Sequence, residues 1–152
     1  MNPSYLFRAT AHWTDRRQGI VEGEPPAPAI AFSAPPEFQG EPGFWTPEHF
    51  LLASVSGCFI TTFRAIAELS KFSFDGLTVA VEGQIEKAED GLRFTQIVLQ
   101  PILRIGAAMD RERAIRLLEK AERSCLIARS LKAAVSMKPM VEIAAPAQAA
   151  AA

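Results

Sequence analysis

The sequence is poor in the residues that build metal sites and disulfide frameworks. Its 152 residues include only two cysteines and two histidines. A secreted disulfide scaffold has more cysteines, a structural zinc site needs closely spaced ligands, and a catalytic metal site rich in histidine needs more than two. We therefore expect none of these. Cys58 and Cys125 lie far apart in the chain, so they are either inert core residues or a redox pair that the fold brings together.

An excess of charge of one sign and long apolar runs are also absent. Sixteen Lys and Arg residues face seventeen Asp and Glu residues, which argues against nucleic acid or an anionic membrane as the main partner. No run approaches the roughly 18 uninterrupted apolar residues of a membrane span. The first residues lack the basic-then-apolar layout of a signal peptide. We therefore expect a cytoplasmic protein with no nucleic-acid or membrane partner.

The overall composition is that of a globular protein. Apolar residues make up 49% of the chain and charged residues 22%, which is too apolar for a disordered protein. The length suits one domain with its own core. We expect a single domain over residues 1–143, followed by a low-complexity, alanine-rich tail at 144–152 that frays.

The first half of the chain predicts short strands and one long helix. Strands are predicted at residues 4–13, 20–22 and 29–33. Thr46, Pro47 and Glu48 then give the N-cap, the first-turn proline and the first-turn acid of a helix that runs to about residue 71. From residue 50 to 66 this helix is apolar or small on nearly every face, which indicates a helix buried all round.

The second half predicts a hairpin, two helices and a last strand. The predicted hairpin strands are residues 77–86 and 92–104, with a bulge between Phe94 and Ile97. The later elements are a helix at 111–124 capped by Asp110, a short helix at 125–132 and a strand at 134–143. Because strands and helices do not alternate regularly, this order predicts an α+β fold.

Two arginines and one glutamate are candidates for activating a cysteine. A nucleophilic thiolate needs a nearby cation, and with so few histidines arginine is the alternative, which points to Arg16 and Arg17. A carboxylate such as Glu48 can hold a guanidinium in place. The ordinary interpretation of these residues is that the two arginines lie in a solvated loop and that Glu48 is stabilised by the dipole at the start of the helix.

Two segments around the cysteines resemble the OsmC/Ohr family of osmotically inducible and organic hydroperoxide resistance proteins. The first is GFWTPEHFLLASVSGCF at 43–59, where a Pro-Glu helix start precedes a cysteine by ten residues, and the second is AERSCLIARSL at 121–131. With the order of elements, the likeness covers residues 5–143. It implies an OsmC-like fold with antiparallel sheets around a long buried central helix, in an intertwined homodimer with its active sites at the subunit boundary.

The resemblance also implies roles for individual residues. Cys58 aligns with the peroxidatic cysteine and Cys125 with the resolving cysteine. Glu48 aligns with the carboxylate that holds the activating arginine. Arg17, in an Arg-x-Gly pattern, is the best match for that arginine, and Arg16 is the alternative. The residue after the second cysteine is commonly proline in the family and is leucine here, at 126, so the chain is closer to the OsmC-like branch.

The activity that the resemblance implies is thiol-dependent reduction of hydroperoxides, with no bound cofactor or metal and with an external dithiol, of lipoyl type, as the reductant. Three aromatic residues in the loop at 35–45 would bind organic substrates, namely Phe38, Phe44 and Trp45. The alternatives are a small-molecule binding protein of the same fold, or a stress-response protein without turnover.

The spacing of Glu48 and Cys58 raises a geometric question. Ten residues of straight helix separate two side chains by about 15 Å. The helix must therefore bend near Ser56 and Gly57, or Glu48 must reach the thiol of another subunit, or it must act through Arg17. The intertwined homodimer that the resemblance implies, with active sites at the subunit boundary, fits the last two options. A partner chain would also cover the apolar central helix, so we expect a homodimer.

Overall fold

The computed structural model describes residues 2–145. The chain divides into two compact units, Met1–Leu51 and Leu52–Ala152, called here the first and second unit. The helix α1 (Pro47–Leu69) begins in the first unit and continues into the second. Residues 146–152 of the predicted tail lie outside the described residues. A single domain over residues 1–143 stays a prediction.

The first unit contains a three-stranded antiparallel sheet of β1 (Thr10–Asp15), β2 (Gln18–Glu22) and β3 (Ile30–Ser33), in that order. The prediction that the first strand begins at residue 4 is wrong. The last residue of β2, Glu22, pairs with Thr10, so residues before Thr10 have no ladder partner on β2. A short 3-10 turn, η1 (Pro36–Phe38), follows β3.

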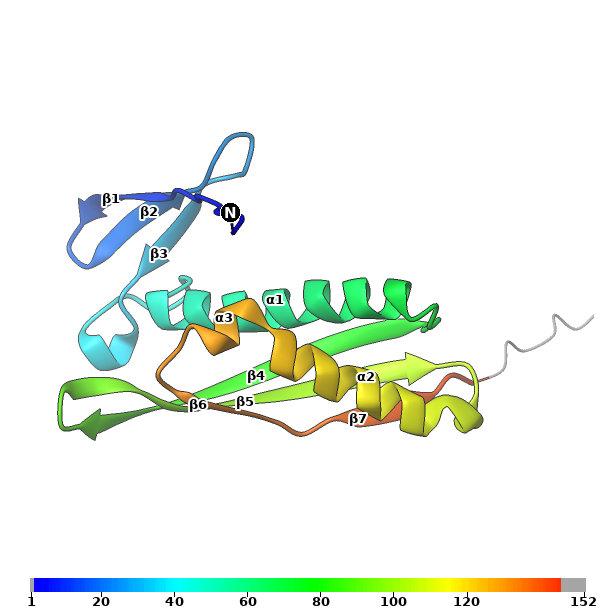
Figure 1. The fold of residues 1–152 in the computed structure, drawn as a ribbon. Helices are drawn as coiled ribbons and strands as arrows, with labels where there is room; N and C mark the ends of the chain where they lie inside the picture. Colours follow the sequence, from blue (N-terminus) through cyan, green and yellow to red (C-terminus); the bar gives the residue numbers. More distant parts are fainter. Residues whose placement is uncertain (1, 146–152) are drawn as a thin grey trace, which may run out of the picture. The chain divides into compact units, whose positions relative to one another are not determined.

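The second unit is built on a sheet of β4 (Gly76–Ala88), β5 (Gly91–Ile105), β6 (Ala134–Met137) and β7 (Met140–Ile143) (Figure 1). The strands β4 and β5 form the predicted hairpin. Its register shifts between Gln84 and Ile85, which leaves Thr95 of β5 unpaired and confirms the predicted bulge.

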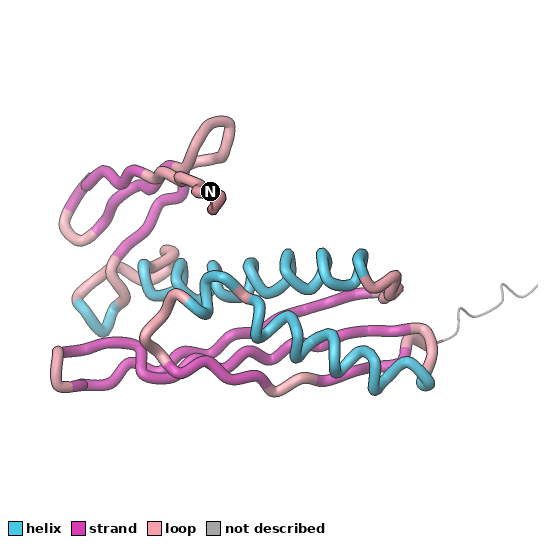
Figure 2. Tube along the Cα trace, viewed as in Figure 1, coloured by secondary structure: helices cyan, strands magenta, loops and turns pink. Residues whose placement is uncertain are grey.

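Two expectations for the end of the sheet are wrong. The single strand expected at 134–143 is two strands, interrupted at Lys138 and Pro139 (Figure 2). Proline has no N–H, so residue 139 cannot donate a hydrogen bond to the ladder. Both β6 and β7 run parallel to β5, so this sheet is mixed and not antiparallel. The helical segment after β5 carries the chain back toward the end of the sheet at which β5 begins. The strands that follow can therefore run parallel to β5.

Three helices lie on one face of this sheet: the second-unit part of α1, α2 (Arg111–Ser124) and the short α3 (Leu126–Arg129) (Figure 1). The core lies between them and β5. Its fully buried large side chains include Val55, Phe59, Phe63, Ile97, Leu99, Leu103 and Leu118. The fold is therefore α+β, as predicted.

The long helix α1 buries one face in the single chain, and the expectation that it is buried all round is not met there. Its exposed positions include Ala53, Gly57, Ile60, Thr61 and Ala65. By length and composition alone α1 could also cross a membrane, with a mean hydropathy of 1.6 over its most apolar window. The central helix of a soluble protein meets the same criterion.

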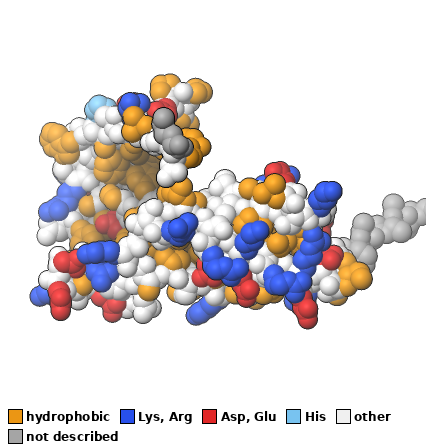
Figure 3. Space-filling model, viewed as in Figure 1, with side chains coloured by type: hydrophobic (Ala, Val, Ile, Leu, Met, Phe, Trp, Pro, Cys, Tyr) orange, Lys and Arg blue, Asp and Glu red, His pale blue; other side chains and the backbone are white. Residues whose placement is uncertain are grey.

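The helix α2 is amphipathic. It buries Ala114, Leu118 and Ala121, and its outer surface carries Lys and Arg side chains interspersed with Glu (Figure 3). Asp110 precedes it as predicted but makes no side-chain cap hydrogen bond, because it belongs to a 3-10 turn, η2 (Ala108–Asp110), with helical backbone angles. The cap expected at Thr46 of α1 is formed, since Thr46 Oγ1 accepts a hydrogen bond from the N–H of His49 at 3.1 Å.

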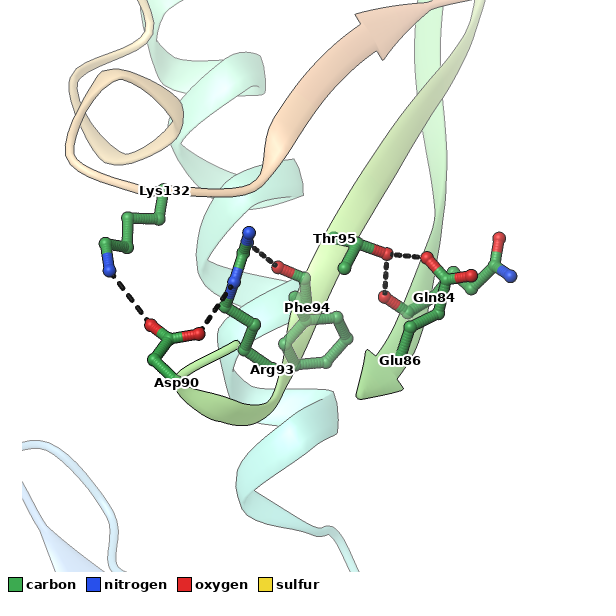
Figure 4. A network of polar contacts seen from close by, with 7 residues as sticks. All are labelled: Gln84, Glu86, Asp90, Arg93, Phe94, Thr95 and Lys132. Carbon is green, nitrogen blue, oxygen red and sulfur yellow. Dashed lines mark hydrogen bonds and ion pairs between the residues drawn. The ribbon is translucent and has the colours of Figure 1, made fainter. Parts of the chain in front are cut away.

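Polar contacts fix the tip of the β4–β5 hairpin to the connection that follows α3 (Figure 4). Asp90 forms ion pairs with Lys132, at 3.0 Å, and with Arg93, at 3.4 Å. The hydrogen bond from the Lys132 side chain is the largest of the effects that lower the pKa of Asp90. At the bulge, Thr95 donates a hydrogen bond to the carboxylate of Glu86. These contacts hold the segment that leads from α3 into β6.

Candidate functional site

The two cysteines lie side by side in the second unit, although they are far apart in the sequence. Cys58 is in the middle of α1. Cys125 occupies the single residue between α2 and α3, where the backbone is extended, with φ −63° and ψ 110°. This break turns the chain so that both the Cys125 side chain and the first residues of α3 face α1.

The two thiols share a hydrogen bond, and each has a further partner on α1. Cys125 Sγ donates to the carbonyl oxygen of Val55 at 4.0 Å. Cys58 Sγ lies 3.9 Å from Thr62 Oγ1. Both cysteines are reduced; Cys58 is half-buried and Cys125 is fully buried. The alternative of two unconnected core cysteines does not describe this arrangement.

The surroundings of Cys58 favour its thiolate. Burial raises the pKa of the Cys58 thiol, but hydrogen bonds to its sulfur lower that pKa by more, so the net shift is downward. In decreasing order of effect, the hydrogen-bond partners are the backbone of Ile127, the Cys125 thiol, the Thr62 hydroxyl and the backbone of Leu126. A thiolate is the reactive form of cysteine, so Cys58 is the better nucleophile of the pair.

The surroundings of Cys125 favour its neutral thiol. Burial raises the pKa of Cys125, and the backbone of Ala128 lowers it. The hydrogen bond to Cys58 and the negative charge of that neighbour raise it further. The site therefore pairs one thiol whose pKa is lowered with a second thiol whose pKa is raised. This pair can attack an electrophile through one sulfur and then close a disulfide through the other.

The predicted arginines lie in the turn between β1 and β2 of the first unit. Arg17 Nη2 donates a hydrogen bond to Gln39 Oε1 at 3.1 Å. Arg16 Nη1 forms an ion pair with Glu41 at 3.2 Å. The backbone of this turn is also tied to the loop after β3, because the N–H of Ala34 donates to the carbonyl of Arg17 at 2.9 Å.

Glu48 lies in the first turn of α1, as predicted. Its Oε2 atom is buried and has no hydrogen-bond partner among residues 2–145. Within the same described part of the chain, no ion pair joins Glu48 to Arg17. A buried carboxylate oxygen without a partner is costly, so the first turn of α1 holds an unsatisfied acceptor in the single chain.

The aromatic residues of the loop border a cavity of about 290 Å³ in the first unit. Its lining residues are Gly43, Phe44, Trp45 and His49. Trp45 stacks on Phe50, with ring centroids 5.7 Å apart. Two of the three predicted substrate-binding residues thus line the cavity, and Phe38 is not among the lining residues.

Sequence reasoning missed Thr62, His49 and the backbone of Ile127. Thr62 could have been found from its spacing, since it follows Cys58 by one helical turn on the same face. His49 likewise follows Thr46 by one turn, and the two side chains lie 2.8 Å apart. The effect of the Ile127 backbone on the pKa of Cys58 depends on where the helical segment is interrupted at Cys125. No pattern of side chains in the sequence specifies that position.

The described residues 2–145 contain no group of three or more His, Cys, Asp or Glu side chains that could hold a metal ion.

Comparison with models of known families identifies one family. Its sequence profile, described as OsmC-like protein, matches residues 40–139. The uncharacterized protein YmaD of Bacillus subtilis (strain 168) is 27% identical over 135 residues, which cover 87% of this chain and 90% of YmaD.

Solved structures have the same fold. An OsmC-like protein of unknown function from Vibrio cholerae gives a TM-score of 0.80 at 19% identity, covering 90% of this chain and all of that one. An organic hydroperoxide resistance protein from Elizabethkingia anophelis gives a TM-score of 0.75 at 23% identity, covering 95% of this chain and all of that one.

The two thiols should differ in reactivity toward iodoacetamide. As the pH rises, Cys58 ionises before Cys125, because the pKa of Cys58 is lowered and that of Cys125 is raised. At neutral pH Cys58 should therefore be alkylated first. Mass spectrometry distinguishes the two, since trypsin releases them in separate peptides, residues 18–64 and 124–129. In urea both should react alike, and faster labelling of Cys125 in the folded protein would contradict the assignment.

Proposed function

The chain belongs to the OsmC-like protein family, and on that premise we propose that it reduces organic hydroperoxides with Cys58 as the peroxidatic cysteine and Cys125 as the resolving cysteine. The match of the family profile over residues 40–139 confirms the resemblance found in the sequence. The relative from Elizabethkingia anophelis, an organic hydroperoxide resistance protein, supports this choice of substrate class.

The observation on which the proposal rests is the proximity of the two thiols, each of which shifts the pKa of the other. Two cysteines in unrelated parts of a core would not influence each other in this way. Here one thiol has a lowered pKa and the other a raised pKa, which matches the different demands of attack and resolution.

In the first step, the Cys58 thiolate attacks the distal oxygen of the hydroperoxide. A sulfur–oxygen bond forms, the oxygen–oxygen bond breaks, and the alkoxide leaves and takes a proton to become an alcohol. The sulfur is oxidised to a sulfenic acid, and the peroxide is reduced by two electrons.

In the second step, Cys125 attacks the Cys58 sulfur of the sulfenic acid. A disulfide forms, and the hydroxyl group leaves with the Cys125 proton as water. An external dithiol, for which we propose a lipoyl-type compound, then reduces the disulfide by two thiol–disulfide exchanges and becomes a disulfide itself. In this scheme the protein needs no bound cofactor or metal.

Arg17 and Glu48 complete the proposed machinery at the boundary between two subunits. Arg17 would stabilise the thiolate and orient the peroxide, and Glu48 would hold the guanidinium. The unpartnered Oε2 atom of Glu48 supports this role, because it leaves an acceptor available for a guanidinium. In the described single chain, Arg17 is bonded to Gln39 instead, and would have to exchange that partner.

The proposed substrates are apolar hydroperoxides in the cytoplasm. The cavity lined by Phe44 and Trp45 offers aromatic surface to an alkyl or aryl group, and Phe38 would add to it. The near balance of charges supports the absence of a nucleic-acid or anionic-membrane partner.

Excess cumene hydroperoxide should oxidise both thiols of the reduced protein. Thiol titration should show the loss of both, with the disulfide detected by mass spectrometry. In Cys58→Ser the remaining thiol should survive. In Cys125→Ser the Cys58 thiol should still be consumed, but without a disulfide, to a sulfenic acid that excess peroxide oxidises to the sulfinic acid. Thiols that resist excess peroxide in the wild-type protein would favour a binding protein of the same fold.

The two neighbouring arginines offer a matched test of the guanidinium. Arg17→Lys keeps the charge but loses the bidentate donors, so kcat/KM for cumene hydroperoxide should fall by about tenfold to a hundredfold. Arg16→Lys, the control, should leave kcat/KM within about twofold, because Arg16 makes only a surface ion pair with Glu41. The reverse pattern would assign the role to Arg16.

Light scattering at micromolar concentration should give twice the mass of one chain. If the exposed face of α1 lies in the dimer interface, Ala65→Glu should shift the protein toward the monomer, because it places a charge there. Ala80→Glu, at an exposed position of β4, is the matched control and should stay dimeric. A monomeric wild-type protein would contradict the homodimer.

A further inference from the structure

Two adjacent threonines of α1, Thr61 and Thr62, use their hydroxyl groups differently. Threonine in a helix commonly turns its hydroxyl back to a carbonyl three or four residues earlier. Thr61 does so, and donates to the carbonyls of Gly57, at 3.2 Å, and Cys58, at 3.1 Å. The hydroxyl of Thr62 instead lies 3.9 Å from the Cys58 sulfur.

The direction of the Thr62 contact follows from the charge on Cys58. A thiol can donate or accept, but a thiolate can only accept. Once Cys58 ionises, the Thr62 hydroxyl must therefore be the donor. The Cys125 side chain also lowers the pKa of Cys58, so a hydroxyl on α1 and a thiol at the α2–α3 junction both favour its negative charge.

We propose that Thr62 is a positioning residue for the reactive thiol, whose hydroxyl donates a hydrogen bond to the Cys58 sulfur and stabilises the thiolate before it meets the peroxide. The inference rests on the proposed function in taking Cys58 as the nucleophile. It adds a residue to the machinery that the family resemblance did not supply. Its half-buried position on α1 keeps the hydroxyl in place beside the sulfur.

The experiment measures the rate of Cys58 alkylation by iodoacetamide against pH in four full-length proteins. Thr62→Val removes the hydroxyl at nearly constant shape, and Thr62→Ser restores it. Thr61→Val is the matched control, because it removes a hydroxyl from the next position that contacts only backbone carbonyls. Circular dichroism verifies that each variant is folded.

In Thr62→Val the midpoint of the pH profile should move upward. At pH values below the midpoint, Cys58 alkylation should slow by about three- to tenfold, the effect of one hydrogen bond. The plateau at high pH should not fall, because a more basic thiolate is intrinsically more nucleophilic. Thr62→Ser and Thr61→Val should follow the wild-type profile.

The inference is overturned if Thr62→Val leaves the midpoint unchanged, or if Thr61→Val moves it equally. A lower plateau with an unchanged midpoint would show a merely structural role and would also overturn it. Alkylation uses no peroxide, so the result is independent of turnover. A wild-type protein that consumes no cumene hydroperoxide but shows the Thr62→Val shift would overturn the proposed function and uphold this inference.

Discussion

The contact between Cys58 and Cys125 depends on a single break in the helical connection behind the sheet. Were α2 and α3 one continuous helix, residue 125 would be one more position on an amphipathic stripe. Because Cys125 is extended, the chain turns there, and the first residues of α3 face the middle of α1. The core side chains around it, Phe59 and Leu118 among them, fix both helices on the sheet and hold the two sulfurs at one place.

The two units of the chain contribute different groups to the proposed site. The nucleophilic pair and the donors that lower the pKa of Cys58 all belong to the second unit. The first unit holds the arginine turn, the carboxylate of Glu48 and the aromatic cavity. Under the proposed function, the sheet and helices of the second unit would by themselves prepare the thiols for reaction. The groups proposed to recognise the peroxide come from a separate unit, where substrate preference can change without altering the thiols.

The sequence was informative where a local pattern determines structure. The start of α1, the β4–β5 hairpin with its bulge, and the extent of α2 all follow from caps, alternation and helical spacing. The parallel pairing of β6 and β7 could not be predicted, because it depends on where the crossover returns to the sheet. In the site, the two cysteines were identified from their flanking segments. The hydrogen bonds around them were not, because the backbone donors to Cys58 depend on the dihedral angles of one residue.

The leucine at position 126 has a physical consequence for this pair. Proline there would have no N–H, whereas Leu126 keeps one, and its backbone is among the groups that lower the pKa of Cys58. Together with Ile127, Thr62 and Cys125, it stabilises a negative sulfur with neutral dipoles. Dipoles fixed by the fold require no mobile cation to be in place before the thiol ionises. Under the proposed function, the main role of Arg17 is then to stabilise the peroxide, whose leaving oxygen develops the new negative charge.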